Sequence, residues 1–262
     1  MISLRNRVIA IVILASLLMV VAISTTAYQS LGEDQRELIL EQEKLKAQRL
    51  TEQVRQNIRQ RILALSAARA LFKNDGELRA LDELEDQISG QSYLEQFFPG
   101  GVLVFDAEDT AVAENTYVPD RIGTNYADRP HFKQLHSSGE PVISRPIMGR
   151  TTGVPLLSFL VPIHHEGRML GSVGGVIKLG EESILPARAE RQDRRTGTLS
   201  LIIDADDRLY IESPRSSSRK ELQPLPPAGE NALIDSTLEN TSGSAVIDYQ
   251  GQQYLLATDS VD

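Results

Sequence analysis

Residues 155–179 read PLLSFLVPIHHEGRMLGSVGGVIKL, and this stretch decides the fold. It contains two apolar runs, 155–163 and 169–179, each long enough to form a strand. The four residues between the runs, His-His-Glu-Gly, are polar and end in glycine. Glycine there supplies the positive φ angle that a tight hairpin turn needs. The stretch therefore predicts two long antiparallel strands joined by a hairpin.

Further strand pairs are expected on both sides of this hairpin. Residues 101–115, GVLVFDAEDTAVAEN, show an apolar run, a polar Asp-Ala-Glu-Asp turn and an alternating return strand. Residues 202–212, IIDADDRLYIE, repeat that layout. Residues 246–258, VIDYQGQQYLLAT, have the strand-turn-strand form of the first hairpin. Such a repeat indicates two related sheet modules in series.

A long helix precedes the strands. Residues 29–73 contain no proline and a single glycine, and apolar residues recur there in steps of three, four and seven. This periodicity predicts an amphipathic helix, assigned to residues 29–75 and on the order of 60 Å long. It is interpreted either as a solvated coiled-coil stalk or as a helix that packs on the domain and pairs with a second copy. We expect a parallel homodimer through this helix.

The N-terminal segment is expected to be a membrane anchor. Residues 8–28 form an uncharged run that is long enough to cross about 30 Å of hydrocarbon. Arg5 and Arg7 precede this run, and Glu33 and Asp34 follow it. The positive side should remain in the cytoplasm, so residues 1–7 are expected inside and the bulk of the chain outside. A cleaved signal peptide is the alternative, and it exports the same domain.

Composition excludes several classes of function. The chain has no Cys, so disulfides, thiolate metal sites and Cys nucleophiles are ruled out. A net charge of -9 argues against nucleic acid as a partner, because such surfaces need clustered positive charge. No G-x-S-x-G elbow surrounds Ser144, and no Gly-rich phosphate loop occurs. We therefore expect no catalytic site and no cofactor in this chain.

Metal binding is also not expected. His164 and His165 are adjacent on a strand end and should point to opposite faces, which favours a turn role over a shared ion. The acidic cluster of Asp106, Glu108 and Asp109 offers oxygen ligands but lacks the spacing and the distal Glu of a calcium loop. A solvated turn is the simpler interpretation of that cluster.

Residues 127–179, ADRPHFKQLHSSGEPVISRPIMGRTTGVPLLSFLVPIHHEGRMLGSVGGVIKL, resemble the membrane-distal module of double Cache sensor domains. The matching elements are Asp128-Arg129 followed by His131-Phe132, then Ser144-Arg145-Pro146, then the Gly-Arg-Thr-Thr-Gly run at 149–153. The resemblance extends over residues 8–262 and is closest in the distal module. It implies an α+β fold with two PAS-like antiparallel-sheet modules in series beside one long helix.

The resemblance also implies a domain plan and a function. The distal module is expected at 76–190 and a proximal module at 191–262, which the chain end at Asp262 would truncate, as in a fragment of a longer receptor. Such modules sense small metabolites outside the inner membrane, in the periplasm. The expected output is a diguanylate cyclase that makes cyclic di-GMP. A histidine kinase, a chemoreceptor, or a partner-binding module without a small ligand are the alternatives.

Arg129 is the first candidate for contact with a ligand. A guanidinium presents a planar fork that matches a carboxylate. In amino-acid-binding members of the resembled family, an Arg followed two and three residues later by aromatics holds the carboxylate. Arg129, His131 and Phe132 have that spacing. The alternative is that Arg129 pairs with a surface acid such as Asp106 or Asp128.

The remaining amino-acid signature of that family is absent. Its acidic residue for the ammonium group corresponds to Val176 here, and its Tyr and Asp after the Ser-Arg-Pro run correspond to Ile147 and Gly149. An unpaired ammonium in an apolar pocket is costly, so a small carboxylate is the expected ligand. Protonated His131 would add to its affinity as the pH falls through about 6.5. A solvated rim is the alternative for Arg145 and for Arg150. The candidate set is Arg129, His131, Phe132, Arg145, Arg150, Tyr126 and Ser144.

Overall fold

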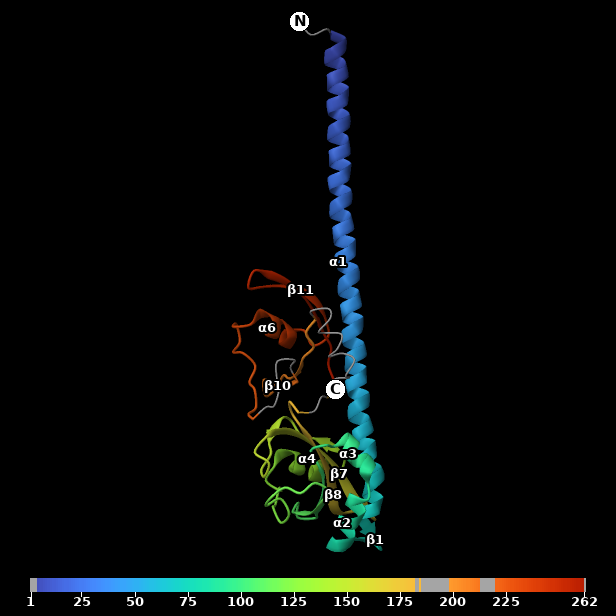
Figure 1. Ribbon diagram of the computed structural model, residues 1–262, viewed down its shortest axis with the longest axis vertical. Coiled ribbons are helices and arrows are strands. Elements are labelled where there is room, and N and C mark those ends of the chain that lie inside the picture. Colours follow the sequence, from blue (N-terminus) through green and yellow to red (C-terminus); the bar gives the residue numbers. More distant parts are fainter. Residues whose placement is uncertain (1–3, 182–183, 185–197, 213–219, 262) are drawn as a thin grey trace. The chain divides into compact units, whose positions relative to one another are not determined.

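The computed structural model describes residues 4–181, 184, 198–212 and 220–261 (Figure 1). The chain divides into two compact units. The larger comprises Leu50–Glu230 with Val261–Asp262, and the smaller comprises Met1–Arg49 with Asn231–Ser260. The predicted division into modules at 76–190 and 191–262 stays a prediction.

One continuous helix, α1 (Leu4–Ala68), takes in both helical segments expected from the sequence, and a 3-10 turn, η1 (Arg69–Phe72), extends it. Within the larger unit its apolar face is buried, with Val54, Leu65 and Ala68 at most 3% exposed. Among the residues that the structure describes, no helix has an apolar stretch long enough to cross a membrane. The transmembrane span expected at 8–28 stays a prediction.

A six-stranded antiparallel sheet forms the centre of the larger unit, in the order β4-β3-β8-β7-β5, with β6 also pairing with β7. The hairpin predicted at 155–179 is confirmed as β7 (Pro155–His165) and β8 (Arg168–Lys178). Its turn is shorter than expected, because both histidines belong to β7. The two-residue turn, Glu166 and Gly167, has φ angles of 47° and 82°. The other strands are β3 (Val102–Asp106), β4 (Ala111–Glu114), β5 (Val142–Ile143) and β6 (Ile147–Met148).

The two faces of the sheet carry separate apolar cores, because successive side chains on a strand point to opposite sides. Leu157, Phe159 and Val161 of β7 belong to the core that includes the buried face of α1. Leu156 and Leu160 belong to the second core. Both faces of the two central strands are thus covered, which explains their nearly continuous apolar sequence.

Short helices complete the two layers. On the α1 side, α2 (Leu81–Ser89) and α3 (Ser92–Phe97) follow a small hairpin, β1 (Lys73–Asn74) and β2 (Glu77–Leu78). On the opposite side, α4 (Pro130–Ser138) contributes Phe132 and Leu135 to the second core. This helix ends at Gly139, whose φ of 67° suits a left-handed C-cap.

Two further hairpins confirm the strand pairs predicted near the C-terminus. In the larger unit, β9 (Ile202–Asp204) pairs with β10 (Leu209–Glu212). In the smaller unit, β11 (Gly243–Tyr249) pairs with β12 (Gln252–Thr258). The helix α6 (Ala232–Glu239) precedes that pair and is capped by the Asn231 side chain. Helices and antiparallel sheets together make the expected α+β fold.

Candidate ligand pocket

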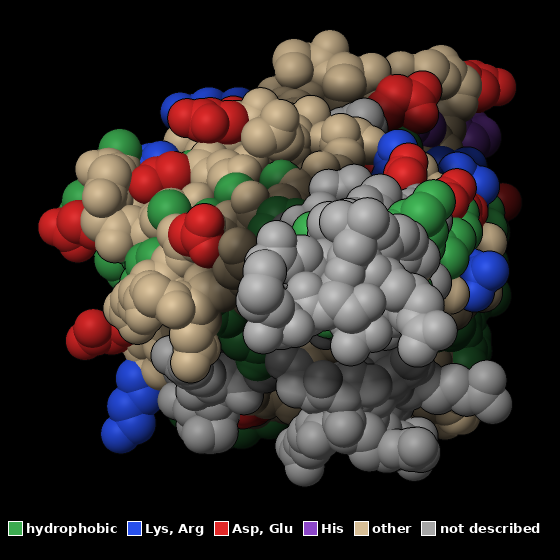
Figure 2. Space-filling model, turned by 90° about the horizontal axis from the view of Figure 1, so that it is seen from above, with side chains coloured by type: hydrophobic (Ala, Val, Ile, Leu, Met, Phe, Trp, Pro, Cys, Tyr) green, Lys and Arg blue, Asp and Glu red, His purple; other side chains and the backbone are tan. Residues whose placement is uncertain are grey.

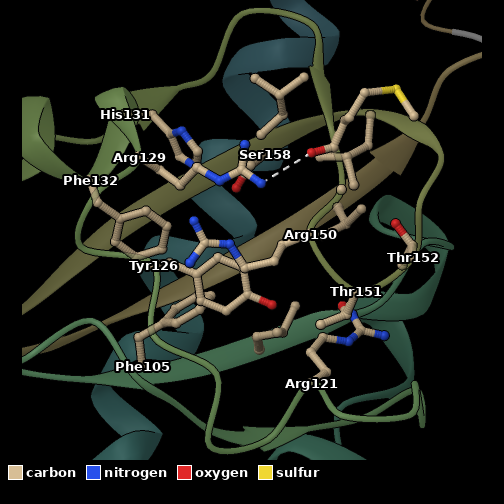
Figure 3. Close-up of a pocket in the computed structure, with 16 residues that line it drawn as sticks. Phe105, Arg121, Tyr126, Arg129, His131, Phe132, Arg150, Thr151, Thr152 and Ser158 are labelled. Carbon is tan, nitrogen blue, oxygen red and sulfur yellow. Dashed lines mark hydrogen bonds between the residues drawn. The ribbon is translucent and has the colours of Figure 1, made fainter. Parts of the chain in front are cut away.

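The second face of the central sheet is hollowed into a pocket of about 490 Å³, including its open mouth (Figure 3). Strands β3, β7 and β8 form its floor, and the start of α4 and residues 147–152 form its walls. On the floor, Ser158 of β7 lies directly opposite Val176 of β8. The pocket therefore lies in the module where the sequence resemblance is closest.

Aromatic rings form one wall of the pocket. The Phe105 ring meets the edges of Phe132 and Tyr126 at centroid distances of 4.9 and 5.5 Å. Tyr126 and Phe132 stack at 5.9 Å. Such ring pairs hold one another in fixed orientations, so this wall is preformed. It gives a ligand an apolar surface to pack against.

Arg129 occupies the N-cap position of α4, and its side chain does not cap the helix. Its guanidinium turns into the pocket, where Nη2 donates a long hydrogen bond of 3.4 Å to the Met148 carbonyl (Figure 3). The positive end of a helix dipole adds to the guanidinium charge at this point. Two features of one short segment thus favour an anion here.

His131 is a neutral member of the pocket. Its side chain is only 5% exposed, and burial, followed by the charge of Arg129, lowers its pKa from 6.5 to about 4. The imidazole is therefore uncharged at neutral pH. The expectation that a protonated His131 helps to hold an anion is corrected, because the same burial that places it in the wall disfavours its charge.

Two of the three arginines that line the pocket are already paired with acids. Buried Arg121 lies 2.8 Å from Glu114, although the two groups are not aligned for a hydrogen bond, and donates to the Thr116 carbonyl. Arg150 donates to the Asp128 carboxylate and to the Asn125 carbonyl. The hydrogen bond from Arg150 lowers the pKa of Asp128, so this carboxyl stays ionised.

Arg129 has no such partner. Within the part of the chain that the structure describes, no carboxylate lies within ion-pair distance of its guanidinium. The described residues that line the pocket include no Asp or Glu. Since Arg121 and Arg150 are paired with acids and His131 is uncharged, the described residues of the pocket carry one uncompensated positive charge. Arg129, the first candidate from the sequence, carries that charge.

The structure brings together five of the seven candidate residues: Arg129, His131, Phe132, Tyr126 and Arg150. Arg145 and Ser144 do not line the pocket. The Arg145 guanidinium contacts three acids of the β9–β10 hairpin, and the closest contact is 2.5 Å, to Asp206. The Ser144 hydroxyl accepts a hydrogen bond from the Ser158 amide at 2.8 Å and fixes the β5–β6 connection to β7.

Sequence reasoning missed several pocket residues. Arg121 comes from a loop before the resembling stretch, and its position depends on the fold of that loop. Ser158 lies within the stretch and is marked by no motif, whereas Thr152 belongs to the Gly-Arg-Thr-Thr-Gly run at 149–153 but was not among the candidate residues. Alternation along β7 was the one usable signal for Ser158, because Leu156 and Leu160 face the same side.

The acidic turn at Asp106 serves local structure. The Asp106 carboxylate accepts hydrogen bonds from the backbone N–H groups of Glu108 and Thr110, at 3.1 and 2.8 Å. Asp109 is buried and contacts the His136 imidazole at 2.8 Å. Acidic and basic side chains are interspersed on the described part of the face in Figure 2. Asp106 therefore holds the turn, and Asp109 links it to α4 through His136.

No protein-family model and no curated protein sequence matches this chain. Solved structures do match. The ligand-binding domain of the Pseudomonas fluorescens chemoreceptor CtaA, in complex with L-serine, aligns with a TM-score of 0.60 at 17% identity, over 84% of this chain and 89% of that chain. The same domain of the Pseudomonas aeruginosa PAO1 amino-acid chemoreceptor PctC, in complex with GABA, aligns at 0.61 and 13% identity, over 84% and 91%.

A third example is the ligand-binding domain of the Pseudomonas aeruginosa PAO1 amino-acid chemoreceptor PctB with L-Arg. It aligns with a TM-score of 0.57 at 15% identity, over 82% of this chain and 85% of that chain. At such identities the similarity establishes the fold. The chain has the fold of the ligand-binding domains of bacterial chemoreceptors, as the double Cache resemblance implies.

Proposed function

We propose that this chain is the extracytoplasmic ligand-binding region of a signalling receptor and binds a small organic anion in the pocket of the larger unit. The observation that carries the proposal is the unpaired guanidinium of Arg129 inside a preformed pocket. A guanidinium that turns into a pocket and has no acid partner among the described residues is available to pair with an anionic ligand. A module that binds only protein partners has no need for such a charge in a concave site.

The ligand is expected to lack an ammonium group. Val176 lies on the floor, 8% exposed, in the strand where the resembled family carries its acid. The described residues that line the pocket include no carboxylate that could pair with an amine. An α-amino acid would have to bury its ammonium without a counter-charge. The ligands in the matched chemoreceptor structures therefore do not transfer directly to this chain.

The receptor class that the comparisons favour is a chemoreceptor. The matched structures named above are all chemoreceptor ligand-binding domains. The diguanylate cyclase output expected from the sequence has no counterpart among those matches, and a chemotaxis output becomes the better supported alternative. We infer a sensing role without catalysis for the chain in either case.

Location outside the cytoplasm is part of the same proposal. It is supported by the matched domains and by Arg5 and Arg7, which precede the uncharged residues 8–28. An alkaline phosphatase fused after residue 262 should be active in bacteria. An inactive phosphatase fusion, with an active cytoplasmic reporter at the same point, would reverse this location.

Calorimetry with short carboxylates tests the binding function. We expect Arg129→Ala to weaken binding at least about tenfold, because losing a charged hydrogen bond corresponds to about 1.5–3 kcal/mol. Arg129→Lys should restore binding only in part, because an ammonium lacks the planar fork. Arg168→Ala, on the exposed end of β8, is the matched control and should bind normally. If the unaltered protein and Arg129→Ala bind a confirmed ligand with equal affinity, Arg129 is not part of the binding site.

A further inference from the structure

Ser158 places a free hydroxyl on the floor of the pocket. Its backbone is occupied, since the N–H donates to Ser144 Oγ at 2.8 Å and the carbonyl accepts from the Ser144 N–H at 2.7 Å. The residue is nevertheless 8% exposed and lines the pocket, so its accessible surface belongs to the side chain. Within the described part of the chain, no group forms a hydrogen bond with its hydroxyl. The hydroxyl is therefore available to a molecule in the pocket.

The strand register fixes the direction of this side chain. Leu156 and Leu160, two residues before and after Ser158 on β7, belong to the apolar core on the pocket side of the sheet. Side chains at every second position of a strand share one face, so Ser158 points to that side as well. Val176 lies opposite Ser158 on β8 and lines the same pocket. Ser158 thus presents a hydroxyl to the pocket from between apolar neighbours.

The start of α4 packs over this part of β7. Phe132, on the first turn of α4, shares one apolar core with the two leucines that flank Ser158. Arg129 is the N-cap residue of that turn, and its guanidinium turns into the pocket. In the view of Figure 3, Ser158 lies at the end of the pocket that holds the Arg129 guanidinium, and Arg121 lies at the other end. The unpaired cation and the free hydroxyl thus serve the same end of the pocket.

A carboxylate can accept hydrogen bonds from both groups at once. Its two oxygens offer more lone-pair positions than one guanidinium fork occupies. A hydroxyl beside the fork can donate to a remaining position, and this hydrogen bond is strong because the acceptor is ionised. The hydroxyl adds no charge of its own. It therefore strengthens the binding of a carboxylate without attracting a second one.

We propose that Ser158 is a second ligand-binding residue, and that its hydroxyl donates a hydrogen bond to the carboxylate with which Arg129 pairs. This assignment rests on the proposed binding function and adds an orientation to it. The carboxyl group of the ligand lies against the sheet at the Arg129 end of the pocket, and the remainder of the ligand extends away from Ser158.

Two substitutions of the same shape isolate the hydroxyl. Threonine and valine at position 158 differ only by a hydroxyl in place of a methyl group, and the hydrogen bonds with Ser144 involve the Ser158 backbone, so both variants keep them. Calorimetry on the whole chain uses the straight-chain acids from propionate to hexanoate as probes. We expect Ser158→Thr to bind these acids about tenfold more tightly than Ser158→Val. Because the carboxylate is common to all the probes, the ratio should be the same at each chain length.

A double-mutant cycle tests whether the two residues hold the same group. Ser158→Ala should weaken binding of the acids about tenfold in the unaltered protein, and less than about threefold when residue 129 is already alanine. The losses are not additive, because without Arg129 the carboxylate is no longer held beside the hydroxyl. Equal losses in both backgrounds, a loss confined to some chain lengths, or equal affinities of Ser158→Thr and Ser158→Val would overturn the assignment.

The two proposals fail separately. If Arg129→Ala weakens binding while Ser158→Thr and Ser158→Val bind alike, the binding function stands and the role of Ser158 is wrong. If no acid of the series binds the unaltered protein, the anion-binding function itself is contradicted, and the role of Ser158 falls with it.

Discussion

Ser158 of β7 and Val176 of β8 lie directly opposite each other in the sheet, and both side chains face the ligand pocket. The register of the two central strands thus sets the chemistry of the pocket floor. One residue earlier on β8, Gly175 faces the other side and lies against Phe98 of the helical layer. A change at 176 therefore alters the pocket without entering the core beneath α1.

Val176→Asp should abolish most carboxylate binding. The new carboxylate would share the pocket with Arg129, whose guanidinium is the one uncompensated charge there. A ligand would then compete with an internal acid, and we expect its affinity to fall at least about tenfold. Titration calorimetry with the tightest monocarboxylate measures the loss.

Val176→Thr is the control for this change, because threonine keeps the shape of valine without a charge. It should retain affinity within about threefold, corresponding to less than about 1 kcal/mol. Unchanged carboxylate binding in Val176→Asp would show that Arg129 does not set the ligand's charge.

The sequence predicted the elements with strong periodicity. Alternation and turn chemistry located the β7–β8 hairpin, and the spacing of apolar residues located the long helix. It did not reveal that Arg145 reaches the β9–β10 hairpin, because that contact joins positions about sixty residues apart. Arg145 entered the candidate site as a member of the Ser-Arg-Pro run that matches the resembled family, whereas the direction of its side chain depends on tertiary structure.

The family resemblance pointed to Val176, and its position on the pocket floor agrees, whereas the expected charge on His131 was wrong. Strand alternation determines which side a residue faces, and that follows from the local sequence. The charge of an imidazole depends on burial by distant segments, which lowers its pKa. The side of the strand that a residue faces was thus predictable. The protonation state of His131 and the pairing of Arg121 and Arg150 with acids were not.

Gly175 should be intolerant of even a methyl group. A Cβ at this position would lie 2.4 Å from the Phe98 ring, which is 1% exposed and packs edge-on against Phe159. Gly175→Ala should lower the free energy of unfolding by about 1–3 kcal/mol. Gly243→Ala, where a Cβ meets nothing within 4 Å, should change it by less than about 0.5 kcal/mol. Urea denaturation compares the two, and equal stabilities would contradict the tight packing at Gly175.

His131 should make the fold sensitive to acid. Its pKa is lowered by burial and by Arg129 to about 4, so the unfolded chain binds a proton first as the pH falls. The stability contributed by the neutral imidazole is complete above pH 6.5 and is lost as the pH falls towards 4. The loss amounts to about 3 kcal/mol at most.

His131→Phe removes that titration. The difference in unfolding free energy between protein and variant should therefore change with pH between about 6.5 and 4 and be constant above 7. Ligand affinity should vary less than about twofold between pH 8 and 6, because His131 is neutral throughout. A constant difference across the whole range would contradict the lowered pKa.

Single cysteines along α1 test the proposed parallel dimer. Leu38 and Leu45 are seven residues apart and 59% and 46% exposed, whereas Val54 is 3% exposed in the core of the larger unit. Residues 1–262 contain no native Cys, so each introduced thiol is the only one in this region. In the full receptor, Leu38→Cys and Leu45→Cys should crosslink between copies and Val54→Cys should not. Crosslinking at Val54 alone, or at none of the three, would argue against pairing through this face.

Arg145 is expected to stabilise the β9–β10 hairpin and to leave ligand affinity unchanged. Its guanidinium contacts Asp204 and Asp207 at 3.3 Å and Asp206 at 2.5 Å, and Asp204 also accepts hydrogen bonds from the N–H groups of the turn. Arg145→Ala leaves these three carboxylates close together without their cation, so they repel one another.

Hydrogen exchange of residues 202–212 should therefore become faster in Arg145→Ala, while calorimetry gives the same ligand affinity within about twofold. Arg55→Ala, which removes an ion pair within α1, is the control and should leave exchange in the hairpin unaltered. The hairpin effect without a binding effect would establish that Arg145 is a structural link between the β5–β6 connection and the hairpin. A large loss of ligand affinity in Arg145→Ala, with normal hydrogen exchange in the hairpin, would instead show that Arg145 belongs to the ligand site.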